Sequence, residues 1–282
     1  MSLLEAKHIT KEYDGRTIIQ DISIHLETGE LISLLGLSGS GKTTLFQVLS
    51  GLTRPEEGEV FLNGREITGK PGAVSYMLQK DLLLPHKKVI DNVSLPLVLK
   101  GMKKKDAREA ADRFFAEFGL DGYQDQYPDR MSGGMRQRAA FLRTYLSTMV
   151  QTGDVPGLDA AALAGADPGS AGRNPAAHGA ALLDEPFSAL DTITKGQLHT
   201  WYLEMMQRIR LSTIFITHDI DEAILLSDRI YLMTARPGVI EHEIRILPPR
   251  DRRKDFNLTQ EFLDYKKQII HILGSSEPLE SA

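Results

Sequence analysis

Residues 36–43 read GLSGSGKT, and this stretch decides how the chain folds. It matches the pattern G-x-x-x-x-G-K-[ST] at every fixed position, a pattern typical of a loop whose backbone N–H groups surround the phosphates of a nucleotide. A Gly-Ser-rich turn that contains a lysine by chance is the alternative interpretation. The complete match favours the phosphate-binding loop.

The segments on either side of the loop supply the strand and the helix that such a loop joins. Residues 31–35 form an apolar run typical of a buried strand, and residues 42–49 have helical spacing of their apolar side chains. Gly36, Gly39 and Gly41 can adopt positive φ without a Cβ clash, so successive N–H groups can turn toward one anion. The first turn of the helix adds unpaired N–H donors and the positive end of its dipole.

Two side chains complete the predicted phosphate site. The motif places the Lys42 ammonium on the β- and γ-phosphates of the nucleotide and the Thr43 hydroxyl on Mg²⁺. The sequence therefore predicts a nucleoside triphosphate and Mg²⁺ as ligands of this loop.

A second informative stretch, residues 180–186, reads AALLDEP. Its apolar residues predict a buried strand, which places Asp184 and Glu185 at the carboxyl end, where open α/β sheets bind ligands. We expect Asp184 to contact Mg²⁺, directly or through water, and Glu185 to orient or deprotonate the water that attacks the γ-phosphate. A positioned general base contributes about 10²–10⁴-fold in rate. A strand that merely ends in an acidic turn is the alternative, and the phosphate-binding loop disfavours it.

The composition is that of an ordinary globular protein. The 282 residues suffice for one large α/β domain or two modest ones, and 41% are hydrophobic and 25% charged. A formal net charge of −5 argues against a nucleic-acid partner. The chain has no cysteine, which excludes disulfides, thiolate metal sites and cysteine nucleophiles. Since neither a signal peptide nor a membrane-spanning stretch is recognisable, we expect a cytoplasmic protein that reaches a membrane only through a partner.

Short strands that alternate with helices in the second half of the chain predict a mostly parallel sheet. The dipeptide Asn63-Gly64 between two short strands predicts a hairpin with a primed turn. The expected strands are residues 3–8, 17–24, 31–35, 59–62, 65–68, 74–78, 180–183, 213–217, 229–233 and 239–247. The expected helices include residues 42–49, 104–118, 134–146 and 259–273.

Further motifs occur in the order in which one known family carries them. Residues 131–138, MSGGMRQR, resemble the signature motif of ATP-binding cassette (ABC) proteins. Residues 188–191, SALD, resemble the D-loop of the same family, and residues 217–219, THD, resemble its switch histidine. Gln79 fits the glutamine of the family's Q-loop, and Tyr13 fits the aromatic residue that stacks on adenine. The joint occurrence of these motifs in this order resembles an ABC ATPase over most of the chain.

The resemblance, with the loop and the acidic pair, implies a fold and a set of site residues. The expected fold is an α/β P-loop NTPase with a mostly parallel sheet core, an antiparallel β subdomain and a helical signature subdomain. The expected catalytic residues are Glu185, His218 and Gln79, and the expected Mg²⁺ contacts are Thr43, Gln79 and Asp184. The expected ATP contacts are Tyr13, Gly36, Ser38, Gly39, Ser40, Gly41, Lys42, Thr43, Thr44, Ser132, Gly133, Gly134 and Asp191.

The resemblance also implies a homodimer. The serine hydroxyl and two glycine N–H groups of residues 132–134, at the start of a helix, form a second anion cradle in a chain with one phosphate loop. In the family, two cassettes meet head to tail, and each ATP lies between the phosphate loop of one copy and the signature of the other. The contact is isologous, so a second copy of this chain is the expected partner. His218 would hold the γ-phosphate and bridge toward Asp191 across the dimer.

The segment after Gln79 resembles the part of importer ATPases that receives a coupling helix of the permease. Residues 82–84, LLL, and Pro85 would supply its apolar rim; a segment that is merely core is the alternative. Met135 in place of the usual glutamine, together with residues 235–238, ARPG, resembles the nitrate, sulfonate and taurine importer group. Relatives of that group import pyrimidine vitamin precursors.

These likenesses predict the ATP-hydrolysing, energy-coupling subunit of an ABC importer for a small solute, held peripherally at the cytoplasmic face of the membrane. The expected partners are permease subunits and, indirectly, an extracytoplasmic solute-binding protein. The alternatives are the ATPase of an ABC exporter and a soluble ABC ATPase that acts on ribosomes or DNA. A non-hydrolysing binding module would have lost Glu185 or Lys42, and both are present.

The expected ABC ATPase domain covers residues 1–247, with a helical subdomain at about 84–147 and a helical tail at 248–282. Residues 148–179 depart from the family, which usually has a short connection there. Their composition, rich in Gly, Ala, Asp and Pro, favours a flexible loop. Since this insert joins the amino end of the acidic strand, opposite the nucleotide side, we expect ATP hydrolysis to persist when residues 151–177 are removed.

The tail carries weaker patterns. Residues 239–247 alternate like an edge strand. Residues 259–273 have helical spacing of apolar side chains and predict a helix that docks on its own domain. The basic run at 250–254 is interpreted as a solvated segment.

Overall fold

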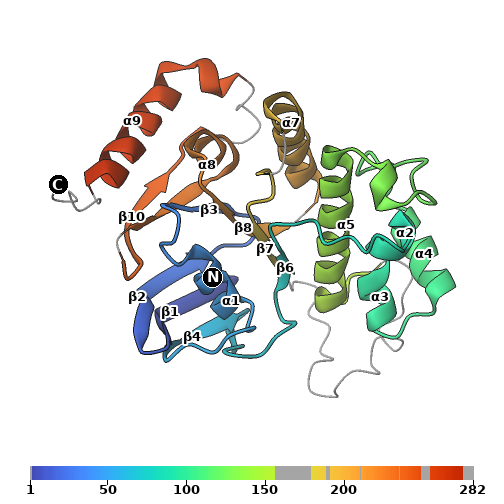
Figure 1. The fold of residues 1–282 in the computed structure, drawn as a ribbon, viewed down its shortest axis with the longest axis horizontal. Helices are drawn as coiled ribbons and strands as arrows, with labels where there is room; N and C mark the ends of the chain where they lie inside the picture. The colour runs from blue at the N-terminus through green and yellow to red at the C-terminus, as the bar shows by residue number, and fades with distance from the viewer. Residues whose placement is uncertain are drawn as a thin grey trace.

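The computed structural model describes residues 2–155, 179–188, 191–209, 211–234, 236–248 and 255–275. Within these ranges the chain forms a central sheet, an antiparallel sheet beside it and a group of helices on the opposite side (Figure 1). The antiparallel sheet is drawn in blue, and the helical group in green.

The central sheet is mostly parallel and buried. Its strands are β3 (Leu31–Gly36), β6 (Ser75–Met77), β7 (Ala180–Asp184), β8 (Ser212–Thr217), β9 (Arg229–Thr234) and β10 (Val239–Arg245). They lie in the order β10-β9-β3-β8-β7-β6, and the neighbouring pairs are parallel except for β10 with β9. Every residue of β3, β7, β8 and β9 is buried, which explains why these strands are mostly apolar rather than alternating.

The second sheet is antiparallel. It consists of β1 (Leu4–Tyr13), β2 (Arg16–Leu26), β4 (Glu57–Leu62) and β5 (Arg65–Glu66), in the order β2-β1-β4-β5. The predicted hairpin joins β4 to β5 through Asn63 (φ 50°) and Gly64 (φ 73°), the positive values that a primed turn requires. Strand β1 runs beyond the predicted residues 3–8 because register shifts, one of them at His8 (φ 52°), interrupt its alternating pattern.

Helix α1 (Lys42–Leu49), which follows β3, packs against both sheets. Its side chains Leu45, Phe46 and Leu49 are completely buried in one apolar cluster with residues of β1, β2, β3 and β8. Each fully buried side chain of this size stabilises the fold by about 1.5–3 kcal/mol. The loop that joins β3 to α1 is therefore held at both ends by rigid elements.

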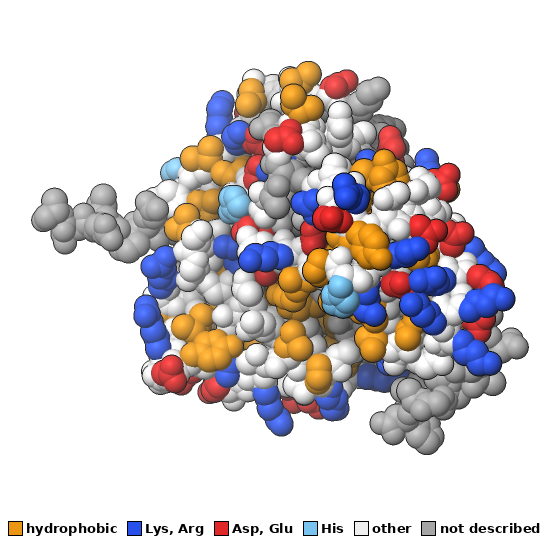
Figure 2. Space-filling view, turned by 45° about the vertical axis from the view of Figure 1, so that its right-hand side comes forward, with side chains coloured by type: hydrophobic (Ala, Val, Ile, Leu, Met, Phe, Trp, Pro, Cys, Tyr) orange, Lys and Arg blue, Asp and Glu red, His pale blue; other side chains and the backbone are white. Residues whose placement is uncertain are grey.

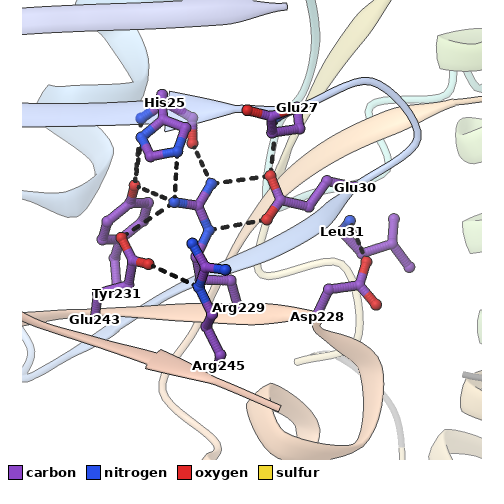
Figure 3. Close-up of polar contacts among 9 residues, drawn as sticks. All are labelled: His25, Glu27, Glu30, Leu31, Asp228, Arg229, Tyr231, Glu243 and Arg245. Atoms are coloured by element: carbon purple, nitrogen blue, oxygen red, sulfur yellow. Dashed lines mark hydrogen bonds and ion pairs between the residues drawn. The ribbon is translucent and has the colours of Figure 1, made fainter. Parts of the chain in front are cut away.

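A buried arginine joins the two sheets (Figure 3). The Arg229 side chain is 2% exposed, and its Nε and Nη2 each lie 2.9 Å from a carboxylate oxygen of Glu30. Its Nη1 lies 3.1 Å from Glu243 of β10, and its Nη2 donates to the His25 carbonyl of β2 at 2.8 Å. Breaking such a buried pair costs about 3–5 kcal/mol, so this cluster fixes β2 against β9 and β10.

The helical group packs around one long helix. Its elements are α2 (Val89–Val93), α3 (Leu95–Leu99), α4 (Lys104–Asp112), the 3₁₀ turn η1 (Pro128–Arg130) and α5 (Gly133–Thr152). Phe118 lies at the centre of an aromatic cluster, with its ring centroid 5.9 Å from Phe141 and 5.7 Å from Tyr145 of α5. It lies 5.9 Å from Trp201 of α7 (Thr192–Arg208), so the cluster joins the helical group to the rest of the domain.

The helix predicted at residues 104–118 is shorter in the structure, and the prediction is wrong beyond Asp112. Residues 113–119 form turns, in which the Phe115 N–H donates to the Asp112 carbonyl, one residue tighter than in an α-helix. This path places Phe118 in the aromatic cluster. Tertiary packing thus overrides the helical spacing of the sequence.

The end of α5 corrects a predicted boundary. The helix continues to Thr152 and therefore includes the first residues of the predicted insert at 148–179. The Thr148 hydroxyl donates to Ser75 Oγ of β6 at 2.8 Å, which fastens this last turn to the central sheet. Residues 156–178, which make up most of the insert, lie outside the described residues.

The chain returns to the central sheet beside the end of α5. A Cβ at Gly179 would lie 2.0 Å from Thr148 Cγ2 and 3.2 Å from Thr152 Cγ2, so this glycine packs directly on the last turn of the helix. Val155, which is 4% exposed, follows Thr152 closely and lies within about 10 Å of it. Val155 and Gly179 therefore lie close together, and Gly179 directly precedes β7.

We expect a protein that lacks residues 156–178 to fold normally and to keep the predicted ATP hydrolysis, because its new junction joins Val155 to Gly179, which lie close together.

The deletion of residues 151–177 is expected to lower the free energy of unfolding by about 2 kcal/mol and the melting temperature by about 5 °C. It removes the buried Val155 and the Gln151 side chain, which accepts a hydrogen bond from Ser75 at 3.1 Å. Thermal denaturation measures the melting temperature of each deletion variant, and phosphate release measures its ATP hydrolysis. Loss of hydrolysis in the variant that lacks residues 156–178 would show that the insert is required.

The C-terminal elements complete one edge of the domain. Strand β10 ends at Arg245, two residues before the predicted end, and helix α9 (Gln260–Ser275) occupies the predicted helical segment. Its Phe262 and Ile269 are buried in a cluster with Ala223 and Ile224 of α8 (Ile220–Leu226). The helix therefore docks on its own domain, as predicted. The basic run at 250–254 lies outside the described residues.

Candidate nucleotide site

The loop between β3 and α1 has the backbone that the motif predicts, with one difference. Gly39 (φ 77°) and Gly41 (φ 97°) have positive φ, whereas Gly36 does not, so the expectation of a left-handed backbone is wrong there. Gly36 is instead required for close packing, because a Cβ would lie 2.4 Å from the Met233 carbonyl oxygen of β9. Gly41 also approaches Ile19 of β2, whose Cγ2 would lie 2.5 Å from an added Cβ.

The side chains of the loop lie between solvent and the central sheet. Ser38, Gly39 and Thr43 are exposed, Gly41 and Thr44 are half-buried, and Ser40 and Lys42 are buried. Gly41 caps α1 without a side-chain hydrogen bond. The first N–H groups of the helix therefore face the loop, where they suit an anion.

Lys42 folds back across the loop. Its Nζ donates to the carbonyl oxygens of Gly36 at 2.9 Å and Leu37 at 2.8 Å. Burial lowers the pKa of Lys42, and the negative charges of Glu185 and Asp184 partly oppose this effect. The ammonium is thus held between the phosphate loop and the acidic pair.

Asp184, the last residue of β7, faces the start of α1. Its Oδ2 lies 3.4 Å from the Thr43 hydroxyl, so the structure brings together two of the predicted Mg²⁺ contacts. The same oxygen accepts a hydrogen bond from the Tyr76 hydroxyl of β6 at 3.2 Å. Burial raises the pKa of Asp184, and the Tyr76 hydrogen bond opposes the rise. Sequence reasoning missed Tyr76, which was read only as part of a strand.

Glu185 is the meeting point of the three predicted catalytic residues. Its Oε2 accepts a hydrogen bond from Gln79 Nε2 at 2.8 Å, and its Oε1 lies 3.0 Å from His218 Nδ1. These residues follow β7, β6 and β8, which are neighbours in the parallel sheet, so their carboxyl ends meet at one edge. Glu185 has φ 47°, a left-handed conformation that costs about 1–3 kcal/mol and is typical of functional sites.

An ion cluster that the sequence did not reveal lies behind His218. Lys195 Nζ of α7 is 2.7 Å from Asp219 Oδ2 and 2.5 Å from Glu222 Oε1 of α8, and His199 Nε2 is 3.3 Å from the same Glu222 oxygen. Burial raises the pKa of Glu222, but contacts with His199 and Lys195 outweigh it and hold the pKa below its usual value. The cluster fixes the turn that carries His218 against α7.

Glu222→Gln is expected to lower the free energy of unfolding by about 3 kcal/mol at pH 7, because it leaves the Lys195 ammonium partly unpaired in a buried position. Since the folded pKa of Glu222 lies below 4.5, its stabilisation is complete above that pH and is lost as the pH falls through the folded pKa. The free energy of unfolding of Glu222→Gln and of the parent is measured by denaturation from pH 7 to pH 3. The difference between the two values should become smaller as the pH falls. A constant difference would contradict this explanation; the exposed Glu261 of α9, replaced by Gln, is the control.

Tyr13 lies at the end of β1, beside α1. Its side chain is 42% exposed, and its hydroxyl donates to Gln47 Oε1 of α1 at 3.3 Å. Lys11 Nζ lies 5.0 Å from the centre of the ring, and Lys11 is itself paired with Glu56 at 2.6 Å. The ring is therefore held near the helix of the phosphate loop with part of its surface open to a ligand.

The signature residues and Asp191 lie at the starts of two other helices. Ser132 caps α5 by accepting a hydrogen bond from the Met135 N–H at 3.3 Å, and Gly133 and Gly134 form the first turn. Asp191 caps α7 by accepting from the N–H groups of Ile193 and Thr194. Within the described ranges, no hydrogen bond or ion pair joins residues 132–134 to the phosphate loop of the same chain.

One contact to the phosphate loop was missed because its motif was interpreted only as a subgroup marker. Arg236 Nη2 donates to the Ser38 carbonyl at 2.8 Å, and an added Cβ at Gly39 would lie 3.1 Å from the same nitrogen. Gly238 also approaches the loop, since its Cβ would lie 2.0 Å from the Ser40 carbonyl oxygen. The residues before β10 thus support the loop from outside.

A carboxylate aligned by an amide and an imidazole, opposite a loop built for phosphates, suits the attack of water on a terminal phosphate. The strand order places both halves of this arrangement at the carboxyl edge of the sheet. The fold and the site define a P-loop nucleoside triphosphatase.

Comparison with known proteins gives the family. The ABC transporter family profile matches residues 19–149. The formylaminopyrimidine import ATP-binding protein ThiZ of Halalkalibacterium halodurans is 36% identical over 89% of this chain and 87% of its own length. The nitrate import ATP-binding protein NrtD of Synechocystis sp. is 34% identical over 99% of this chain and 97% of its own length. The chain belongs to the ABC transporter family.

A solved structure agrees in fold. The dimeric structure of MJ0796, a bacterial ABC transporter cassette, superimposes with a TM-score of 0.66 and covers 87% of this chain and 100% of its own, at 23% identity. These comparisons confirm the predicted family, the α/β P-loop fold and the class of enzyme, an ATPase. The roles of the individual site residues stay predictions.

Proposed function

We propose that this chain hydrolyses ATP to drive the uptake of a small solute, as the energy-coupling subunit of an ABC importer. The contact of Glu185 with both Gln79 and His218, beside the phosphate loop, carries this proposal. A non-hydrolysing binding module would have no need to align a carboxylate in this way. Of the predicted alternatives, an exporter subunit is disfavoured by the relatives, whose names describe import.

In the proposed reaction Lys42 changes its hydrogen-bond partners, and the other residues act from the positions described above. Lys42 leaves the carbonyl oxygens of Gly36 and Leu37 and donates to the β- and γ-phosphates of ATP, since a charged acceptor forms the stronger hydrogen bond. Glu185 accepts a proton from the attacking water or orients it toward the γ-phosphate. His218, whose side chain is 60% exposed, contacts the γ-phosphate and keeps Glu185 in place. Tyr13 stacks on the adenine.

Mg²⁺ fits the residues that lie between the loop and the acidic pair. The Thr43 hydroxyl and the Asp184 carboxylate lie 3.4 Å apart, and they supply the oxygen ligands that Mg²⁺ accepts together with phosphate oxygens and water. Gln79 is the third expected contact. When bound, Mg²⁺ would neutralise charge that develops on the phosphates. Tyr76 donates to Asp184 and so keeps this carboxylate oriented.

Two copies of the chain are expected to form the working unit. Ser132 and the two glycines after it form an anion cradle that makes no contact with the phosphate loop of the same chain in the described residues. We infer that they complete the site of a second copy, with Asp191 at the same seam. The dimeric arrangement of the structurally similar cassette supports this inference.

The permease is expected to dock beside the site. Of the predicted rim residues 82–85, Leu82 is 49% exposed, but Leu83 is 7% exposed and packs in the core, so the prediction is wrong for Leu83 and the alternative interpretation holds there. Leu78, which precedes Gln79, is 42% exposed and adds apolar surface. Figure 2, in which the helical group comes forward, shows hydrophobic side chains gathered between Lys and Arg side chains on this face. No helix in the described part of the chain is long and apolar enough to span a bilayer. The relatives, which are named as import ATP-binding proteins, support a place at the cytoplasmic face of the membrane, where the chain is attached through permease subunits.

The relatives suggest the class of solute. Their names point to nitrate and formylaminopyrimidine, in agreement with the importer group that the signature and the residues before β10 resemble. Such importers also need an extracytoplasmic solute-binding protein, which is the expected indirect partner.

The test is reconstitution of the chain with its permease and solute-binding protein in liposomes. ATP hydrolysis is expected to rise when the binding protein carries its solute, with nitrate and formylaminopyrimidine tried separately. Solute should accumulate in the compartment that contains ATP. The importer assignment would be refuted if the rate of ATP hydrolysis were the same with and without the permease and the solute. Transport of the solute out of the compartment that contains ATP would also refute it.

A further inference from the structure

The turn that carries Gln79 is held from outside by helix α5. We call residues 79–83 the Q-loop turn. The Arg143 guanidinium donates to two successive carbonyl oxygens of this turn, with Nη2 2.6 Å from the Asp81 oxygen and Nη1 2.9 Å from the Leu82 oxygen. Arg136, two helical turns earlier on α5, lies 3.1 Å from the Asp81 carboxylate.

The Q-loop turn has a backbone that needs such support. Leu82 has φ 45°, a left-handed conformation that a leucine rarely adopts and that costs about 1–3 kcal/mol. Its side chain is 49% exposed, so burial contributes little to holding it. The Asp81 carboxylate accepts a hydrogen bond from the Leu83 N–H at 3.1 Å, which closes the turn locally. Just beyond the turn, Asn92 of α2 accepts a hydrogen bond from the Leu84 N–H at 2.6 Å, and within it the Leu83 side chain is buried. The carbonyl oxygens of Asp81 and Leu82 are held by α5.

We propose that Arg143 is a positioning residue for ATP hydrolysis: it holds the Q-loop turn so that the Gln79 amide meets Glu185. The proposal rests on the proposed function, in which Glu185 acts on the attacking water. Gln79 Nε2 donates to Glu185 Oε2 at 2.8 Å, and the turn that orients this amide begins only two residues before the first carbonyl held by Arg143. A shift of the turn therefore moves the amide directly.

We call the two hydrogen bonds from Arg143 to the Asp81 and Leu82 carbonyl oxygens the clamp. This clamp requires arginine. Its planar guanidinium presents parallel N–H groups that match two carbonyl oxygens at once, whereas a lysine ammonium is a point donor on a flexible stem. The residue is half-buried, so water competes weakly for these carbonyls. Arg136 adds an ion pair to the same turn but also donates to the Met131 carbonyl at 2.8 Å, so it is shared between the turn and the signature.

The clamp connects two parts of the site through one rigid element. Ser132 caps the start of α5, and Arg143 lies about 16 Å further along the same helix at 1.5 Å per residue. Because α5 is continuous from Ser132 to Arg143, a shift of the signature residues would move Arg143 and hence the Q-loop turn. Gln79 would then reach Glu185 in one position of α5 and leave it in another.

The test compares Arg143→Ala, Arg143→Lys, Gln79→Ala and the double variant Arg143→Ala/Gln79→Ala in the full chain. Arg143→Ala is expected to lower kcat about tenfold while the Kd for ATP changes less than about twofold, because the clamp touches no residue of the phosphate loop. Arg143→Lys should fall between the parent and the alanine variant. The double variant should match Gln79→Ala alone, since Arg143 acts through Gln79.

Two further variants separate positioning from folding. Leu82→Gly in the Arg143→Ala background is expected to restore part of kcat, because glycine adopts positive φ without strain and the turn then needs less support. Arg108→Ala is the matched control: this arginine of the helical group pairs with Asp91 at 2.7 Å and contacts no residue of the Q-loop turn, so kcat should stay at the parental value.

The outcomes distinguish the two proposals. If Gln79→Ala hydrolyses ATP normally, the role given to Gln79 in the proposed function is wrong. If Gln79→Ala is impaired while Arg143→Ala is normal, or if the two effects multiply in the double variant, the clamp proposal is wrong. A loss of kcat in Arg143→Ala that only tracks a lower melting temperature, with no recovery by Leu82→Gly, would also overturn it.

Discussion

ATP hydrolysis is expected to fall by at least about a hundredfold in Glu185→Gln, while ATP binding stays intact. The substitution keeps the size of the side chain but removes the carboxylate that accepts a proton from water. The phosphate loop is unchanged, because its contact to the acidic pair runs through Asp184 and Lys42 rather than Glu185 alone. Bound ATP should therefore accumulate and hold two copies together.

Phosphate release and light scattering with ATP and Mg²⁺ measure the two halves of this prediction. The variant should form a stable dimer with ATP but not with ADP, whereas the parent should form it only transiently. The control is Glu241→Gln, an exposed residue of β10 that lies outside the site. Unaltered turnover in Glu185→Gln would remove the general base from the mechanism.

Lys42→Ala is expected to weaken ATP binding by at least about a hundredfold, since a lost charged hydrogen bond to phosphate costs about 1.5–3 kcal/mol and Lys42 donates more than one. The present bonds to the Gly36 and Leu37 carbonyls show that the ammonium lies across the mouth of the loop. Its removal also takes away a cation that interacts favourably with the charges of Glu185 and Asp184. Triphosphate and carboxylates would then repel each other.

Titration calorimetry measures this loss directly. Lys103→Ala, an exposed lysine just before α4, provides a matched control with the same change of net charge. The control should bind ATP like the parent. Equal affinity in Lys42→Ala would contradict the assignment of the loop to phosphate binding.

The contiguous parts of the site could be predicted from the sequence, because short motifs fix their own local structure. Residues 36–43 define a loop whose glycines and lysine act within one turn of backbone, and the apolar run before Asp184 places both carboxylates at a strand end. The motif alone, however, does not predict why position 36 must be a glycine. Gly36 makes room for Met233, a residue far away in the sequence and adjacent only in the sheet.

The parts that escaped prediction depend on contacts between distant segments. Tyr76 reaches Asp184, and Arg143 reaches the carbonyl of Asp81, only because parallel strands and α5 bring them together. No local pattern distinguishes Arg143 from the other arginines of α5. The predicted helix 104–118 failed for a related reason, since its periodicity was correct but the aromatic cluster dictated a tighter path.

The packing of Gly179 against the end of α5 has a practical consequence. Because the chain leaves at Val155 and returns at Gly179 within a short span, at the amino end of β7, a foreign module could be spliced there with little distortion of its host. The strand between this junction and Asp184 is roughly 15 Å long, which separates the graft from the reacting phosphate. A fluorescent protein inserted at this point would make the subunit visible in living cells while it keeps its ATP hydrolysis.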